Sequence, residues 1–84
     1  MGAEDWYEAR RPGRGHEFRE AAGAAIARIA ENPLAYPDRY RGARRALVHR
    51  FPYVLWYRAL PDLILVLACV HGKRDLETIR ARLG

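Results

Sequence analysis

The side chains best suited to chemistry lie in the second half of the chain. His71 could accept or donate a proton, while Arg45, Arg50 and Arg74 could hold a phosphate whose negative charge grows during a reaction. Such a set suits RNA cleavage by the RNA's own 2′-hydroxyl, and His71, Arg50 and Arg74 are the catalytic candidates. A histidine at the end of a strand more often makes a structural hydrogen bond, so both interpretations stand.

A larger set of side chains could bind a partner without catalysing a reaction. Fourteen of the fifteen basic residues are arginine, whose planar guanidinium suits bidentate contact with phosphate or carboxylate. Arg44 and Arg45 could equally belong to a solvated strand edge, and tyrosines are as typical of packing as of stacking on a base. The binding candidates are Arg44, Arg45, Arg50, Tyr53, Tyr57, Arg58, Lys73, Arg74 and Arg82.

The net charge of +5 is unevenly distributed along the chain. Residues 1–31 carry a net charge of −1, and residues 32–84 carry +6. An excess of arginine in one half indicates an anionic partner, which could be RNA, DNA or an acidic protein segment. The alternative is a charged surface that keeps a small protein in solution.

Neither a metal site nor a cofactor is expected. His16, His49 and His71 are far apart in sequence, and a single cysteine, Cys69, completes no zinc pattern. We expect Cys69 to be a reduced core residue. The chain shows no basic and apolar leader and no stretch long enough to span a bilayer, which predicts a cytoplasmic protein without membrane contact.

The candidate residues lie on or beside a predicted β-hairpin. Leu63–Val70 is an uninterrupted apolar run, which predicts a central strand buried on both faces. Tyr53–Arg58 alternates as a strand with two different faces, and Leu60–Asp62 supplies the turn between the two. A further strand is expected over Ala43–Phe51, with one polar face.

Helical patterns flank this sheet. Ala3–Arg11 and His16–Glu31 are predicted helices joined by the PGRG turn, and Pro33–Gly42 is predicted to be a rigid loop. Asp75 is expected to cap a final short helix that runs to Leu83. The prediction is one α+β domain over residues 1–84. Its helices, which are a two-helix hairpin and a short C-terminal helix, are expected to lie on one face of a three-stranded antiparallel sheet.

Four segments in this order resemble the RelE/ParE superfamily of small bacterial toxins: WYEARRPGRGHEF, IAENP, FPYVLWY and VLACVHGKRD. The WYEARRPG helix, the ENPLAYP loop and the FPY strand are closer to the ParE members. This resemblance implies the toxin of a type II toxin–antitoxin module, a class associated with plasmid stabilisation. It further implies neutralisation by an acidic antitoxin and action by binding DNA gyrase, and therefore no enzymatic activity.

The resemblance leaves two alternatives open. RelE-like relatives are ribosome-dependent mRNA endoribonucleases, and a degenerate, non-toxic interaction module is the third interpretation. The family places a strand before the first helix, yet only Met1–Glu4 precede Asp5 here. An unpaired sheet edge would follow, and we expect such an edge to favour a homo-oligomer.

Overall fold

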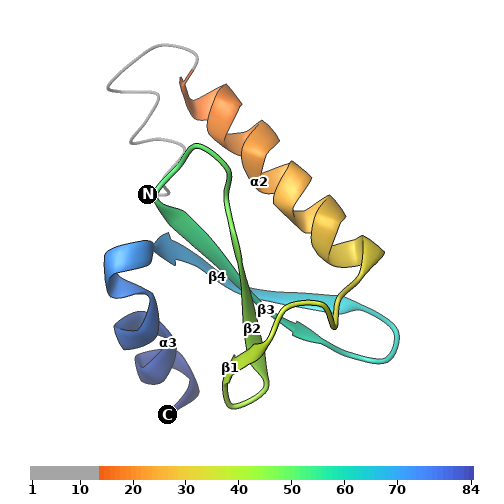
Figure 1. The fold of residues 1–84 in the computed structure, drawn as a ribbon. Helices are drawn as coiled ribbons and strands as arrows, with labels where there is room; N and C mark the ends of the chain where they lie inside the picture. The colour runs from red at the N-terminus through yellow and green to blue at the C-terminus, as the bar shows by residue number, and fades with distance from the viewer. Residues whose placement is uncertain (1–13) are drawn as a thin grey trace.

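The computed structural model describes residues 14–84, which form an α+β arrangement of helices on a single antiparallel sheet (Figure 1). A short 3-10 turn, η1, joins the last strand to the last helix. The elements are α2 (Arg14–Glu31), β1 (Asp38–Tyr40), β2 (Ala43–Leu47), β3 (Tyr53–Ala59), β4 (Ile64–His71), η1 (Gly72–Arg74) and α3 (Asp75–Leu83).

Helix α2 confirms the predicted amphipathic pattern but begins two residues earlier, at Arg14. Its first turn is stabilised by an ion pair from Arg14 Nη1 to Glu17 Oε2, 2.7 Å long. Phe18, Ala25 and Ile29 are buried at helical spacing. The helix ends before Pro33, which cannot continue the backbone hydrogen-bond ladder.

Within residues 14–84 the sheet has the order β1-β2-β3-β4, so in this part of the chain the apolar run does not form the predicted central strand. β3 lies between β2 and β4, and β4 lies at one edge of the sheet that the described residues form. Leu65 and Val66 on β4 are each 44% exposed. The apolar run shows that β4 contains no charged side chain, but this does not determine its place in the sheet. In this hairpin it is the aromatic strand β3 that has a neighbouring strand on both sides.

The first two strands differ from the predicted single strand. Part of the expected loop forms β1, and Arg41 and Gly42 then turn the chain with consecutive positive φ angles of 49° and 81°. β2 ends at Leu47, not at Phe51. After β2, the Phe51 N–H donates a hydrogen bond to the Val48 carbonyl over 3.1 Å and so forms a turn. Residues 48–51 are therefore part of this turn and not of the strand.

The two helices pack against opposite faces of the sheet, as clusters of buried residues show. The prediction of helices on one face is therefore wrong for α3. The first cluster joins α2 to β2 and β3 and contains Ile29, Ala46, Leu55 and Tyr57. The second joins α3 to the same strands and contains Ile79, Ala43, Val54 and Trp56. Successive strand residues alternate between these faces.

The predicted first helix, Ala3–Arg11, lies outside the described residues. Cys69 is exposed, so its placement in the core is wrong, although partial burial of its sulfur raises the pKa of the thiol. Within residues 14–84, no helix is long and apolar enough to cross a membrane.

Candidate functional site

The turn before β3 and the η1 turn after β4 meet at one end of the sheet. Tyr53 pairs with His71 across the two strands, and the Gly72 N–H donates to the Pro52 carbonyl over 2.9 Å. Because the two strands are antiparallel, the start of one lies beside the end of the other (Figure 1). The turn carrying Arg50 is thereby held next to η1.

Aromatic packing fixes this end of the sheet against α2. The ring of Phe18 meets the rings of Phe51 and Tyr53 edge-on, with centroid separations of 5.1 Å and 5.5 Å. The ring of Tyr53 also meets the imidazole of His71 at 5.5 Å. Such edge-to-face contacts add to the stabilisation that burial provides. Tyr53 is therefore enclosed by neighbouring rings, which limits its use as a stacking platform.

His71 makes a structural hydrogen bond. Its Nδ1 accepts the backbone N–H of Lys73 over 3.1 Å and so caps the start of η1. A neutral imidazole with an accepting Nδ1 carries its proton on Nε2. In this arrangement the second nitrogen is a donor, and the neutral ring has no nitrogen left to take a proton from a hydroxyl group.

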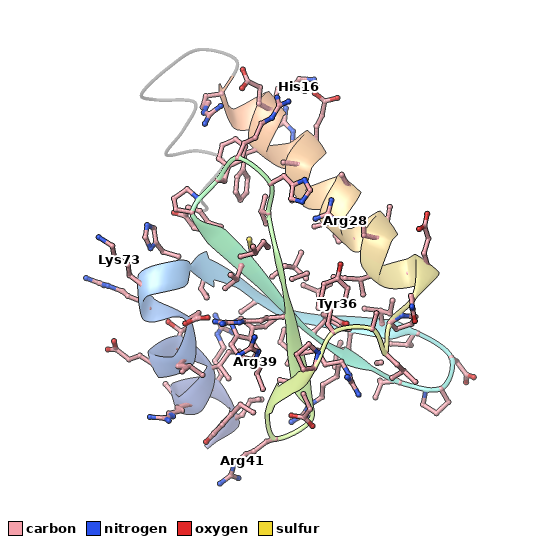
Figure 2. The ribbon with its side chains drawn as sticks, viewed as in Figure 1. His16, Arg28, Tyr36, Arg39, Arg41 and Lys73 are labelled. Carbon is pink, nitrogen blue, oxygen red and sulfur yellow. The ribbon has the colours of Figure 1, made fainter. Side chains whose placement is uncertain are left out.

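Three cations lie on the two turns at this end of the sheet. The side chains of Arg50, Lys73 and Arg74 are exposed and form no ion pair within residues 14–84. Lys73 lies on the outer side of η1 (Figure 2). Arg50 has a φ of 71°, an unusual conformation for a residue other than glycine. We call Arg50, Lys73 and Arg74 the cationic end of the sheet.

Arg44 and Arg45, two of the predicted binding residues, do not form a common cationic surface. They are neighbours on β2 and therefore point to opposite faces. Arg44 Nη1 donates to the Tyr36 carbonyl, and Arg45 Nη1 forms an ion pair with Asp75 Oδ2. Asp75 is thus the first residue of α3 and a buried ion-pair partner of the sheet, not the predicted helix cap.

The other predicted binding residues are spread over several elements. The Tyr57 ring is fully buried, its hydroxyl donates to the Pro33 carbonyl over 2.6 Å, and its burial raises the pKa of the phenol. Arg58 donates to the Arg41 carbonyl over 3.0 Å. Arg82 is exposed on α3. Their roles in binding stay predictions, and of the predicted binding residues the structure gathers Tyr53, Arg50, Lys73 and Arg74 at the end of the sheet that carries His71.

Two surface hollows border these elements. One, of about 390 Å³, lies between α2 and the turn before β3 and is lined by Glu17, Glu20, Ala21, His49, Arg50 and Phe51. Its two carboxylates make it unsuited to a phosphate. The other, of about 300 Å³, is lined by Tyr36, Pro37, Arg39, Arg45, Ala46 and Leu47. Two of its lining residues, Tyr36 and Arg39, are labelled in Figure 2. The sequence did not predict this hollow, because no local pattern marks it.

Comparison with protein families matches residues 3–76 to the ParE toxin of the type II toxin–antitoxin system parDE. The chain belongs to this family. Membership confirms the resemblance read from the spaced sequence segments, and it implies a cognate antitoxin as the partner of this ParE toxin. No match was found among curated proteins or among solved structures.

Proposed function

We propose that this ParE family toxin inhibits DNA gyrase by binding it, without cutting nucleic acid. The family resemblance implies the target, and the cationic end supplies a surface for it. The observation that carries the proposal is the placement of Arg50, Lys73 and Arg74 on two turns held together by the Gly72 to Pro52 hydrogen bond. Three exposed cations on rigid turns favour an acidic or phosphate-bearing surface.

The hydrogen bonding of His71 supports binding over catalysis. A nuclease using this histidine needs a nitrogen free to take the proton of the attacking hydroxyl. His71 Nδ1 already accepts the Lys73 N–H, and the opposite nitrogen of the neutral ring carries the proton. The side chain therefore orders η1 and positions the two cations that follow it.

A RelE-like ribonuclease is the second candidate, because all three catalytic candidates lie at the same end of the sheet. His71 ends β4, Arg74 follows within η1, and Arg50 lies on the turn bonded to η1. In such an enzyme the arginines would stabilise the charge that grows on the phosphate. This candidate requires His71 to release its bond to Lys73 when RNA binds.

Neutralisation by an acidic antitoxin is part of the same proposal. Carboxylates of an antitoxin segment would compete with the target for the cations of this end. The competition would weaken at high salt, since exposed charges are screened over about 10 Å at 0.1 M ionic strength.

Two assays on the purified full chain separate the candidates. The first assay measures how much relaxed plasmid gyrase converts to supercoiled plasmid in the presence of ATP. We expect this conversion to fall as the toxin concentration rises. A translation extract reports the alternative, because a ribosome-dependent nuclease leaves codon-phased cuts in the mRNA. Cuts in the extract together with unchanged supercoiling would refute gyrase inhibition.

A further inference from the structure

The smaller of the two hollows combines an apolar lining with one cation that has no counter-charge among the described residues. We call it the β1 hollow, because the loop before β1, β1 itself and β2 line it. Its lining residues are Tyr36, Pro37, Arg39, Arg45, Ala46 and Leu47, around about 300 Å³. Arg45 is already paired with Asp75, whereas Arg39 is exposed and forms no ion pair within residues 14–84. The hollow therefore suits an apolar group with a single negative charge beside it.

Contacts of the fold hold the lining of the β1 hollow in place. The Tyr36 ring meets the buried Tyr57 ring edge-on at 6.1 Å, and the Tyr36 carbonyl accepts a hydrogen bond from Arg44 Nη1. At the end of β2, Arg28 Nη2 on α2 donates to the Leu47 carbonyl over 3.0 Å. A pre-formed site loses little conformational freedom when it binds, which favours affinity.

The outer side of β2 adds a backbone donor next to the hollow. The Val48 N–H donates to the Tyr53 carbonyl, toward β3, and successive residues of an antiparallel strand direct their backbone groups to opposite sides. The Leu47 N–H therefore points away from β3. On that side, within the described residues, β1 pairs with β2 only at Ala43 and Arg44. An extended peptide can accept this N–H while one of its side chains enters the hollow.

We propose that the β1 hollow anchors an acidic segment of the antitoxin, with one apolar side chain in the hollow and a neighbouring carboxylate on Arg39. The anchoring needs only the antitoxin partner that family membership implies; its effect on gyrase rests on the proposed function. Leu47 ends β2, and Arg50 lies in the turn that follows, so the hollow borders part of the cationic end. Anchoring there raises the local concentration of antitoxin carboxylates around the cationic end.

Other occupants fit the β1 hollow less well. A nucleic acid is held through many phosphates and favours several free cations, but this hollow offers Arg39 alone within a largely apolar lining. A second copy of the chain would bring a further net charge of +5 toward Arg39. An acidic protein segment supplies the carboxylate and the apolar side chain together.

Calorimetry with the full toxin and the antitoxin encoded in the same parDE module tests the inference. We expect Leu47→Glu and Arg39→Glu each to raise the dissociation constant about tenfold, because each places a negative charge where the antitoxin carboxylate binds. Leu63→Glu and Arg80→Glu are the matched controls: both residues are exposed, neither lines the hollow, and the charge changes are the same. We expect the controls to bind as the wild type does. Circular dichroism confirms that each variant is folded.

Hydrogen exchange of the same complex locates the contact. We expect the amides of Arg39 and Leu47 to gain protection when the antitoxin is added, while that of Leu63 does not change. Wild-type affinity in both hollow variants, equal losses in the controls, or a wild-type toxin that binds no antitoxin overturns the inference. Gyrase inhibition measured without antitoxin is a separate readout. Its absence in the wild type would refute the proposed function and leave the antitoxin anchor standing.

Discussion

Arg45 on β2 and Asp75 at the start of α3 form an ion pair between Nη1 and Oδ2, thirty residues apart in sequence. Asp75 is 5% exposed, and the Arg45 guanidinium carbon lies 5.8 Å from the centre of the Trp56 ring. The pair therefore ties the last helix to the face of the sheet that the helix covers. It also removes Arg45 from the cations available to a partner.

We predict that Asp75→Asn destabilises the fold by about 1–3 kcal/mol, because it leaves the half-buried Arg45 without its counter-charge. Urea unfolding measures the change. Glu77→Gln is the control, since Glu77 is also an acid in the first turn of α3 but is exposed. Its effect should stay within about 0.5 kcal/mol. Equal losses in the two variants would show that the helix dipole, not the ion pair, is responsible.

Arg50→Gly should stabilise the protein by up to about 1 kcal/mol while it weakens toxicity. Glycine tolerates the φ of 71° without strain, but it removes one charge from the cationic end. Arg41→Gly is matched to it, because Arg41 has a φ of 49° in the β1–β2 turn. Thermal unfolding and growth arrest on induction are the readouts. Loss of toxicity in both variants would count against a specific role for Arg50.

His71→Asn should leave growth arrest largely intact. The asparagine side chain can accept the Lys73 N–H in place of Nδ1, yet it cannot exchange a proton in a mechanism. His71→Ala should lose about 1 kcal/mol of stability through the missing cap, again with arrest retained. If His71→Asn folds normally and abolishes arrest, the protein is acting as a nuclease.

Stability should fall at alkaline pH because of Tyr57. Burial raises the pKa of this phenol, and the nearby Arg44 opposes the shift. Unfolded tyrosine ionises near pH 10, so the stabilisation is complete below about pH 10 and is lost as the pH rises through the higher folded pKa. Tyr57→Phe removes this loss. The difference in unfolding free energy between the two proteins should shrink above about pH 10; a constant difference would refute the assignment.

The sequence predicted the elements whose patterns are local. The stripe through Phe18, Ala25 and Ile29 identifies α2, and Asp75–Leu83 is the predicted final helix. Strand β4 was recognised, but within residues 14–84 it is not the central strand, because an apolar run reports low polarity and not the number of neighbouring strands. The partners of Tyr57 and Arg45 lie 24 and 30 residues away, so no local spacing could reveal them.

The candidate site was only partly predictable for the same reason. His71, Arg50 and Arg74 were singled out by residue type, and strand pairing brings the segments that carry them together. The sequence did not separate them from Arg44 and Arg45. Those side chains bond within the fold, and this depends on which face each one occupies.

The central claim is that the cationic end binds gyrase. The most direct test is the toxin concentration that halves plasmid supercoiling by gyrase. It is compared for the wild type, for Arg50→Gln/Lys73→Gln/Arg74→Gln, and for the charge-matched control Arg39→Gln/Arg41→Gln/Arg80→Gln. We predict inhibition by the wild type and the control, with about tenfold more of the first variant required. Absence of inhibition by the wild type at any dose, or equal potency of all three proteins, would contradict the claim.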